Sequence, residues 1–242
     1  TGVYGSVEAP LDPGSGGHAG AYVPSTGGNG GGAVRIVAES VVVSGAIRAN
    51  ATGISGASHN SAGSGGGIYI TCKTIAGTGG VVEADAGPCY LAAGSLAGGG
   101  GGGRISVIYD AAAQAALPLP GIRFSAAGSL SGNRDEAGEV GTLYFTDSTF
   151  FSPTNLFTGR WLAPGLSTNL SLSEWTISNT WALLPGMTIT VTNTLRITGT
   201  NVWLSRLELS NASSIVCGRL ELDRAQLVVG HKQLLHALNL YD

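Results

Sequence analysis

The sequence predicts an all-β protein with the architecture of a right-handed parallel β-helix or solenoid. Two repeats support this prediction. Glycine-rich runs, each followed by an alternating strand, recur about every 34 to 38 residues, as measured between Val34, Ile68, Ile105 and Leu143. Leu-x-Leu pairs recur later in the chain, at about 12–13 residues or twice that spacing. Periods of this kind are typical of solenoids and other repeat arrays.

The composition divides the chain into two parts, residues 1–146 and 147–242, which we expect to be continuous with each other. Of the 40 glycines, 34 precede Thr142, whereas all four tryptophans follow it. No segment before residue 230 has a 3.6-residue apolar period over ten positions, so we expect no long helix there. "DAAAQAALPLP" could form a helical turn or two before Pro118 ends it. "HKQLLHALNLYD" is ambiguous between a capping helix and another strand.

Each unit of the first part contains two strands. Alternation places one apolar set of the first strands on a single face: Val34/Ile36/Ala38, Ile68/Ile70/Cys72, Ile105/Val107/Tyr109 and Leu143/Phe145. The opposite face then carries Arg35, Tyr69, Lys73, Arg104 and Ser106.

The second strands are predicted in "GAIRANATG", "GVVEADAG" and "GIRFSAAG", with Ile47, Val82 and Ile122 aligned as the buried position. This alignment places Arg48, Glu83 and Arg123 side by side as a ladder of alternating charge on one face.

The glycine runs themselves have three interpretations. A phosphate-binding loop requires a glycine-rich backbone that opens a helix, whereas Gly98–Gly103 precede the strand "RISVIYD". A flexible linker fits the composition but not the regular recurrence of the runs. We favour packed polyproline-II-like chains, which have no internal hydrogen bonds and can bond to each other where no side chain keeps them apart. Gly100→Val and Gly101→Val are therefore both expected to disrupt folding.

We call the residues of this packed element the glycine wall. They are Gly30, Gly31, Gly32, Gly65, Gly66, Gly67, Gly98, Gly99, Gly100, Gly101, Gly102 and Gly103. In the second part of the chain we expect four pairs of residues to point inward. They are Leu170/Leu172, Leu195/Ile197, Leu207/Leu209 and Leu220/Leu222.

The tracts "GGNGGG", "GSGGG" and "GGGGGG", each alternating with a short β segment, resemble the glycine-rich repeats of extracellular surface and adhesin-type proteins. They also resemble the polyglycine-II sandwiches of some phage tail-fibre adhesins, which carry recognition loops between the tracts. The later Leu-x-Leu segments resemble bacterial and viral β-helices. The first resemblance covers about residues 14–146 and the second about residues 166–230, and both imply a solenoid.

Motifs for chemistry are sparse. Charged residues make up 11% of the chain and the net charge is −3, so nucleic-acid binding through phosphate neutralisation is not expected. No apolar run is long enough for a transmembrane helix. The tightest acidic group, Asp135, Glu136 and Glu139, could hold calcium or belong to a solvated loop, and we favour the loop. Asp110, Arg104 and Arg123 could approximate a polysaccharide-lyase site, although no motif joins them.

The cysteines and the sequons leave alternatives open. Cys72 and Cys89 could form a disulfide, or the cysteines could be small buried apolar side chains. Asn50, Asn169 and Asn211 lie in Asn-x-Ser/Thr sequons, which permit glycosylation of a secreted eukaryotic protein.

These observations favour a non-enzymatic, extracellular or cell-surface structural or adhesive module that needs no cofactor and could be a fibre subunit. We expect its partners to be neighbouring copies or adjacent domains of a larger surface protein, and glycans are a further candidate. The first alternative is a carbohydrate-binding or polysaccharide-cleaving β-helix, with Tyr69, Trp175, Trp181 and Trp203 as candidate sugar-stacking residues. The second is a phage-type adhesin tip with large loops between the tracts.

Overall fold

In a computed structural model the described residues form sixteen strands and a single helix of five residues, and this confirms the all-β class. The described residues are 5–19, 26–53, 60–88, 98–129, 137–152, 157–164, 166–199, 205–210, 213–229 and 234–241. The chain forms two compact units, Thr1–Thr146 (unit 1) and Asp147–Asp242 (unit 2). Within the described ranges, no helix has the length and apolar character needed to cross a membrane.

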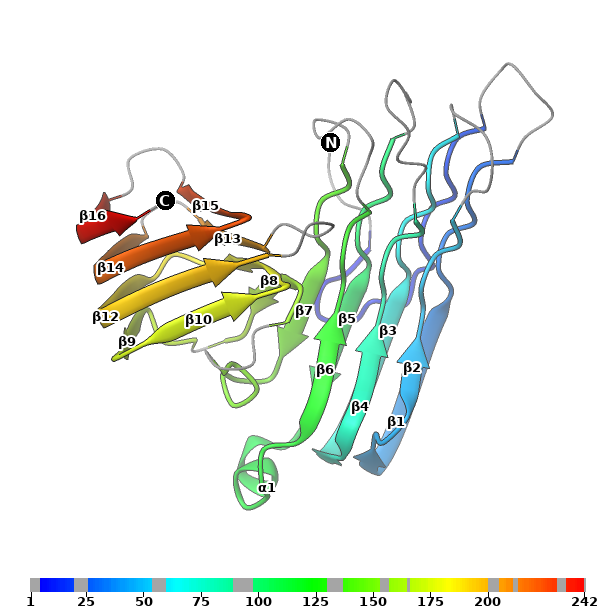
Figure 1. Ribbon diagram of the computed structural model, residues 1–242. Coiled ribbons are helices and arrows are strands. Elements are labelled where there is room, and N and C mark those ends of the chain that lie inside the picture. The colour runs from blue at the N-terminus through cyan, green and yellow to red at the C-terminus, as the bar shows by residue number, and fades with distance from the viewer. Residues whose placement is uncertain are drawn as a thin grey trace. The chain divides into compact units, whose positions relative to one another are not determined.

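Unit 1 contains two parallel sheets whose strands belong to successive layers of the chain (Figure 1). The strands of the first sheet are, in spatial order, β1 (Ala33–Val42), β3 (Gly67–Ala76), β5 (Arg104–Ile108) and β7 (Thr142–Phe145). Those of the second sheet are β2 (Ala46–Arg48), β4 (Thr78–Glu83) and β6 (Gly121–Ser125). Layer 1 thus holds β1 and β2, layer 2 holds β3 and β4, and layer 3 holds β5 and β6.

The register of the first sheet confirms the face predicted from alternation. Val34 lies opposite Ile68, Ile68 opposite Ile105 and Ile105 opposite Leu143. The side chains of Ile68, Ile105 and Leu143 are fully buried, whereas Val34 in layer 1 is only half-buried. The apolar face of layer 1 is therefore the less covered one.

The opposite face of this sheet is covered in a way that the sequence did not predict. Residues 5–13 cross it, and the Ser106 hydroxyl donates to the Glu8 carbonyl at 2.6 Å. Arg104 is consequently buried, and desolvation together with the Glu8 carboxylate raises the pKa of the Tyr144 phenol. A polar outward face was expected, but the covering segment comes from more than 90 residues earlier in the chain, so strand alternation cannot reveal it.

The second sheet confirms half of the predicted charge ladder. Arg48 lies opposite Glu83, and the Arg48 Nε and Glu83 Oε2 atoms are 2.7 Å apart. Arg123 lies on the predicted face but not in the predicted register, because Val82 faces Phe124 rather than Ile122, and Arg123 therefore lies opposite Val81 rather than Glu83.

Ile122 and Phe124 lie on the same face of β6, so alternation alone did not distinguish a register in which Val82 faces Ile122 from one shifted by two residues. The register of the pair also changes between Thr78 and Gly80. Gly79 has a φ of +69° and adds one residue to β4, a bulge that the sequence pattern did not reveal.

The helical turn predicted before Pro118 is present as α1 (Ala111–Ala115). The Asp110 carboxylate accepts hydrogen bonds from the Ala112 and Ala113 amides, each at 3.0 Å, and caps its N-terminus. Gln114 then attaches the helix to β3: its amide Nε2 donates to the Ile75 carbonyl and its Oε1 accepts from the Ile75 amide. Gln114 is 1% exposed, so this pair of bonds is buried.

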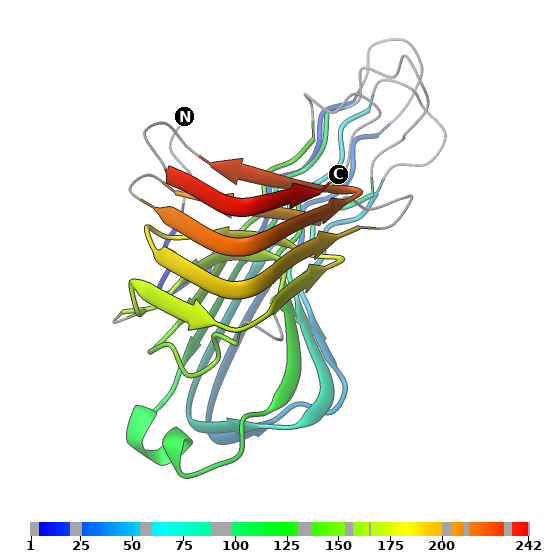
Figure 2. The same ribbon diagram turned by 60° about the vertical axis from the view of Figure 1, so that its left-hand side comes forward.

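Unit 2 is also built from parallel strands stacked layer upon layer (Figure 2). On one side, β8 (Gly159–Leu162), β11 (Trp181–Leu184), β13 (Ser205–Leu209) and β15 (Ala225–Val229) follow one another. On the other side, the long strands β12 (Thr188–Thr198), β14 (Ser214–Asp223) and β16 (Leu234–Tyr241) are stacked. The shorter strands β9 (Asn169–Leu172) and β10 (Trp175–Ser178) pair with the two halves of β12.

The predicted inward pairs of unit 2 belong to different sheets. Leu195 and Ile197 lie opposite Leu220 and Leu222, as their spacing implies. Leu207 and Leu209 lie opposite Leu227 and Val229 in the other sheet, while Leu170 and Leu172 face Ile189 and Val191. The ambiguous C-terminal segment contains the strand β16 rather than a helix.

Candidate functional site

The glycine tracts of unit 1 hydrogen-bond to one another through their backbones. The tract at residues 60–67 shows the pattern best. The Ser61 and Ser64 amides donate to His18 and Ser15, each at 2.9 Å. Ala62 and Gly65 donate to Gly98 and Gly101 of layer 3, at 3.1 and 2.9 Å. Residues three apart thus donate to the same neighbouring segment, as expected for a helix with three residues per turn.

The same tract contacts segments on all sides. Its partners in backbone hydrogen bonds are the segments 15–18, 28–32, 49, 87 and 98–104. Hydrogen bonds to several separate neighbours distinguish this arrangement from a β-sheet, in which a strand bonds to two. The tract therefore satisfies its backbone polar groups through other parts of the chain rather than through water.

Side-chain space explains why most of these positions are glycine. A Cβ atom added at Gly66 would overlap the carbonyl oxygen of Gly32, one at Gly103 that of Gly66, and one at Gly141 that of Gly103. These glycines occupy one register position in successive layers. Each layer therefore needs a glycine at the point where the preceding layer approaches it.

Nine of the twelve wall glycines are close-packed and three are not. An added Cβ would come within 3 Å of backbone atoms at nine positions: Gly30, Gly31, Gly65, Gly66, Gly67, Gly99, Gly100, Gly102 and Gly103. At Gly98 and Gly101 the nearest atoms would be 3.4 and 3.8 Å away, and at Gly32 nothing lies within 4 Å. This space argues against the expectation that Gly101→Val disrupts folding, because Gly98 and Gly101 face the open side of their tract.

Beside the tracts, polar side chains of unit 1 form a chain of hydrogen bonds across the layers. We call it the polar cluster, and its residues are Arg48, Asn50, Glu83, Asp85 and Ser125. Glu83 accepts from Arg48 at 2.7 Å and from Asn50 at 3.4 Å. The Asp85 carboxylate accepts from the Ser125 hydroxyl at 2.6 Å and from the Ala127 amide at 2.7 Å. Both carboxylates thus join one layer to the next.

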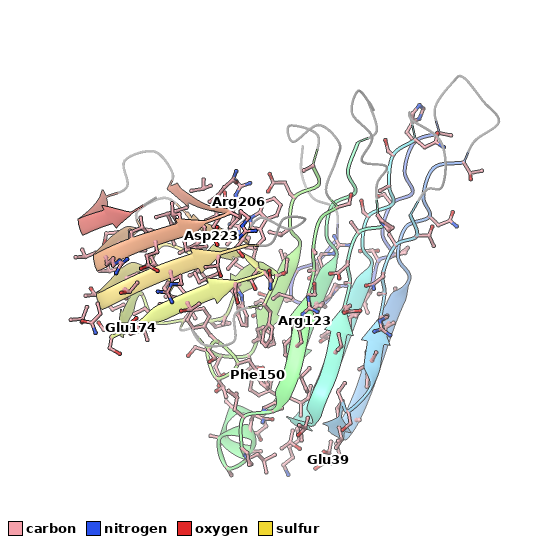
Figure 3. All side chains as sticks on the ribbon, viewed as in Figure 1. Glu39, Arg123, Phe150, Glu174, Arg206 and Asp223 are labelled. Atoms are coloured by element: carbon pink, nitrogen blue, oxygen red, sulfur yellow. The ribbon has the colours of Figure 1, made fainter. Side chains whose placement is uncertain are left out.

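Burial determines the charge state of this cluster. Desolvation raises the pKa of Asp85, although the hydrogen bonds from Ser125 and Ala127 oppose the shift. The Glu83 carboxylate raises this pKa further, and Arg123, labelled on β6 in Figure 3, lowers it. A raised pKa in the folded state means that the folded protein binds the proton more tightly than the unfolded chain.

A pH dependence of stability follows. The free energy of unfolding contributed by Asp85 is expected to increase as the pH falls from neutral through its raised pKa. Asp85→Asn can keep both accepted hydrogen bonds through Oδ1, and its stability should not have this dependence. Urea unfolding from neutral to acidic pH, followed by hydrogen–deuterium exchange of unit 1, measures both proteins. A constant difference between the variant and the wild type would contradict the assignment.

Unit 2 carries a row of charges on the outward side of β12 and β14. Glu221 pairs with Arg196 and, at 2.8 Å, with Arg219. The hydrogen bond from Arg196 lowers the pKa of Glu221. The sign is the reverse of that at Asp85, so the stability from this row is lost as the pH falls through the lowered pKa.

A second polar group of unit 2 lies on β11 and β13. The guanidinium of Arg206, labelled in Figure 3, lies 4.6 Å from the ring centre of Trp181 and pairs with Glu208 at 2.9 Å. The Trp181 Nε1 and Arg206 Nε atoms are buried and have no hydrogen-bond partner among the described residues.

Of the four aromatic residues considered for sugar stacking, Trp175 is 2% exposed and belongs to the core. Tyr69 and Trp181 are half-buried, and Trp203 lies outside the described residues.

The other candidate residues are not brought together. Glu139 is exposed, and Asp135 and Glu136 lie outside the described residues. The part of the chain that the structure describes holds no group of three metal-ligating side chains. Asp110 caps α1 while Arg104 is covered by residues 5–13, so each has a structural role.

The cysteines and sequons can be placed in part. Cys72 is a free, buried thiol, as the second interpretation of the cysteines predicts, and so is Cys217; Cys89 lies outside the described residues. Burial raises the pKa of the Cys72 and Cys217 thiols, which keeps them protonated.

Among the sequons, Asn169 is exposed and Asn211 lies outside the described residues. The Asn50 amide donates to Glu83 and its Oδ1 accepts from the Asp85 amide, so a glycan there would disrupt the polar cluster.

No family model, no curated protein and no solved structure matches this chain.

Proposed function

We propose that this chain is a non-enzymatic structural or adhesive module of the extracellular space or the cell surface. In this proposal it is a parallel β-solenoid whose first part has stacked polyglycine-II-like tracts as one wall. The observation that carries it is the backbone hydrogen bonding of the tract at residues 60–67 to five neighbouring segments. Such bonding joins successive layers to one another, which favours rigidity.

The use of the charged side chains supports the same proposal. Glu83 and Asp85 accept hydrogen bonds from other layers, and Glu221 is held between two arginines. A general acid or base needs a carboxylate that can reach a substrate proton. The carboxylates of these clusters serve instead as links within the module.

Immunogold labelling tests the location. An antibody raised against the purified chain should label intact, non-permeabilised cells that produce the full-length protein. Labelling that appears only after permeabilisation would overturn the extracellular role.

Carbohydrate binding is the second candidate, and the group around Trp181 favours it. The half-buried Trp181 ring, beside the Arg206 guanidinium, could offer a stacking surface to a sugar. A glycan array probed with the wild type and with Trp181→Ala separates the candidates. Saturable binding that Trp181→Ala removes would favour the sugar-binding function, whereas the structural proposal predicts no specific glycan.

A further inference from the structure

The strand β1 leaves one edge of unit 1 open. It pairs with β3 along its full length, and within the described residues no strand pairs with its other edge. Ten residues long, it contains no proline, and its pairing with β3 has no bulge. Edge strands usually carry such a device against pairing with another chain. Figure 1 shows β1 as the outermost strand of its sheet.

The side chains of β1 also lack the cover that later layers have. Ile36 is half-buried, while its register equivalents Ile70 and Val107 are fully buried. Val37 is 67% exposed on the opposite face. Nothing lies within 4 Å of a Cβ added at Gly32. At the equivalent position of each later layer, an added Cβ would overlap the backbone of the preceding layer. The start of β1 therefore has room for another chain.

The adjoining glycine tract does not have the same room. Gly63, Gly100 and Gly138 each lie against the preceding layer, and the register places Asn29 at the equivalent position of layer 1. Asn29 is exposed. Its amide donates to the Thr52 hydroxyl, and its carbonyl accepts from the Thr52 amide. A side chain here blocks a further glycine tract. The open edges of layer 1 are therefore those of β1 and of the three-residue β2, and β1 is much the longer of the two.

The charged residues of β1 indicate which kind of chain could pair with its open edge. Arg35 and Glu39 lie on the same exposed face, two residues before and two residues after Val37. In an antiparallel pair of β1 strands centred on Val37, Arg35 of each copy lies directly opposite Glu39 of the other. The two Val37 side chains then meet on the two-fold axis between two ion pairs.

We propose that a second copy of this chain occupies this edge, in a symmetric dimer joined by antiparallel pairing of the two β1 strands centred on Val37. The proposal goes beyond the structural function given above. Such an isologous contact uses the same patch on both copies and closes on itself, so it gives a pair rather than a filament. In this register Ile36 of each copy lies opposite the small Ala38 of the other, on the inner side of the joined sheet.

Charge exchange tests the dimer. Arg35→Glu places two like-charged pairs across the axis, as does Glu39→Arg, and each is expected to weaken association at least about tenfold. The double variant Arg35→Glu/Glu39→Arg restores both opposite-charge pairs and should dimerise again. Glu39, labelled on β1 in Figure 3, lies 3.5 Å from Lys73 within its own copy, so the double variant should regain most rather than all of the affinity. Arg160→Glu, an equal charge change at an exposed site of unit 2, is the matched control.

Sedimentation equilibrium of the whole chain over a range of concentrations measures these affinities. A monomer at every concentration, open filaments, or single variants that associate like the wild type would each overturn the proposal. Filaments would support head-to-tail addition of a fibre subunit instead.

Cysteine cross-linking gives a second measurement that does not depend on charge. Val37→Cys brings two thiols together on the axis and should form a covalent dimer under mild oxidation, beyond the level of the wild type. Val42→Cys, at an equally exposed valine near the C-terminal end of β1, lies away from the axis and should not. Equal cross-linking at both positions, or none at Val37→Cys, would contradict the antiparallel register.

Discussion

Gly100→Val is expected to abolish the native packing of unit 1. A Cβ at this position would overlap the carbonyl oxygen of Gly63, which belongs to the backbone of the preceding layer and cannot rotate away. The cost should reach or exceed ~3 kcal/mol, the upper end of the usual range for overpacking. Hydrogen–deuterium exchange of peptides from residues 60–67 and 98–103 measures the loss, and their protection should fall together.

Gly101→Val is the matched control for this variant. It is the neighbouring residue and receives the same side chain, but the only atom near its Cβ is the Glu139 carbonyl oxygen at 3.8 Å. We expect its unit 1 to stay folded, with a small loss of stability at most. Equal tolerance of both variants would mean that the tract is a linker, and equal disruption would mean that the tract has no open side.

Trp175→Ala is expected to destabilise unit 2 by about 3–5 kcal/mol. The side chain is 2% exposed and lies in the core beside Leu195, the residue opposite it on β12. Removing it leaves a large cavity next to a strand that pairs with three others. All four tryptophans follow residue 146, so intrinsic fluorescence reports the urea unfolding of unit 2 separately from that of unit 1.

Thr176→Ala controls for the loss of side-chain atoms on the same strand. Thr176 is exposed, and its replacement should change the stability by less than about 0.5 kcal/mol. If Trp175→Ala left the unfolding midpoint unchanged but removed binding of a glycan, Trp175 would be a surface ligand rather than a core residue.

The sequence predicted the parts of the fold that depend on repetition. Alternating residues such as Ile68 and Ile105 lie opposite each other because the same pattern recurs in each layer. The Arg48–Glu83 pair was predicted for the same reason. What repetition does not encode was missed. Alternation did not distinguish Ile122 from Phe124 as the partner of Val82, which misplaced Arg123 by two positions, and residues 5–13 covered an outward face from a distant part of the chain.

The glycine tracts show the same division between what could and what could not be predicted. Packing of the tracts was predicted from their recurrence, because a linker has no reason to recur in step with a strand. Which glycines contact a neighbouring segment depends on how each residue is oriented about the axis of the tract. A run of six identical residues gives no information on that orientation. Only the neighbouring backbones distinguish Gly100 from Gly101.

Amide hydrogen exchange of the glycine tracts tests most directly whether they are packed, hydrogen-bonded elements. The amides of Gly65, Gly66, Gly102 and Gly103 donate to backbone carbonyls at 2.7–2.9 Å. Residue-resolved NMR exchange should find them as protected as the amides of β3 and β5. Exchange at the rate of an unstructured glycine peptide would contradict the packed arrangement and would mean that these tracts are flexible linkers.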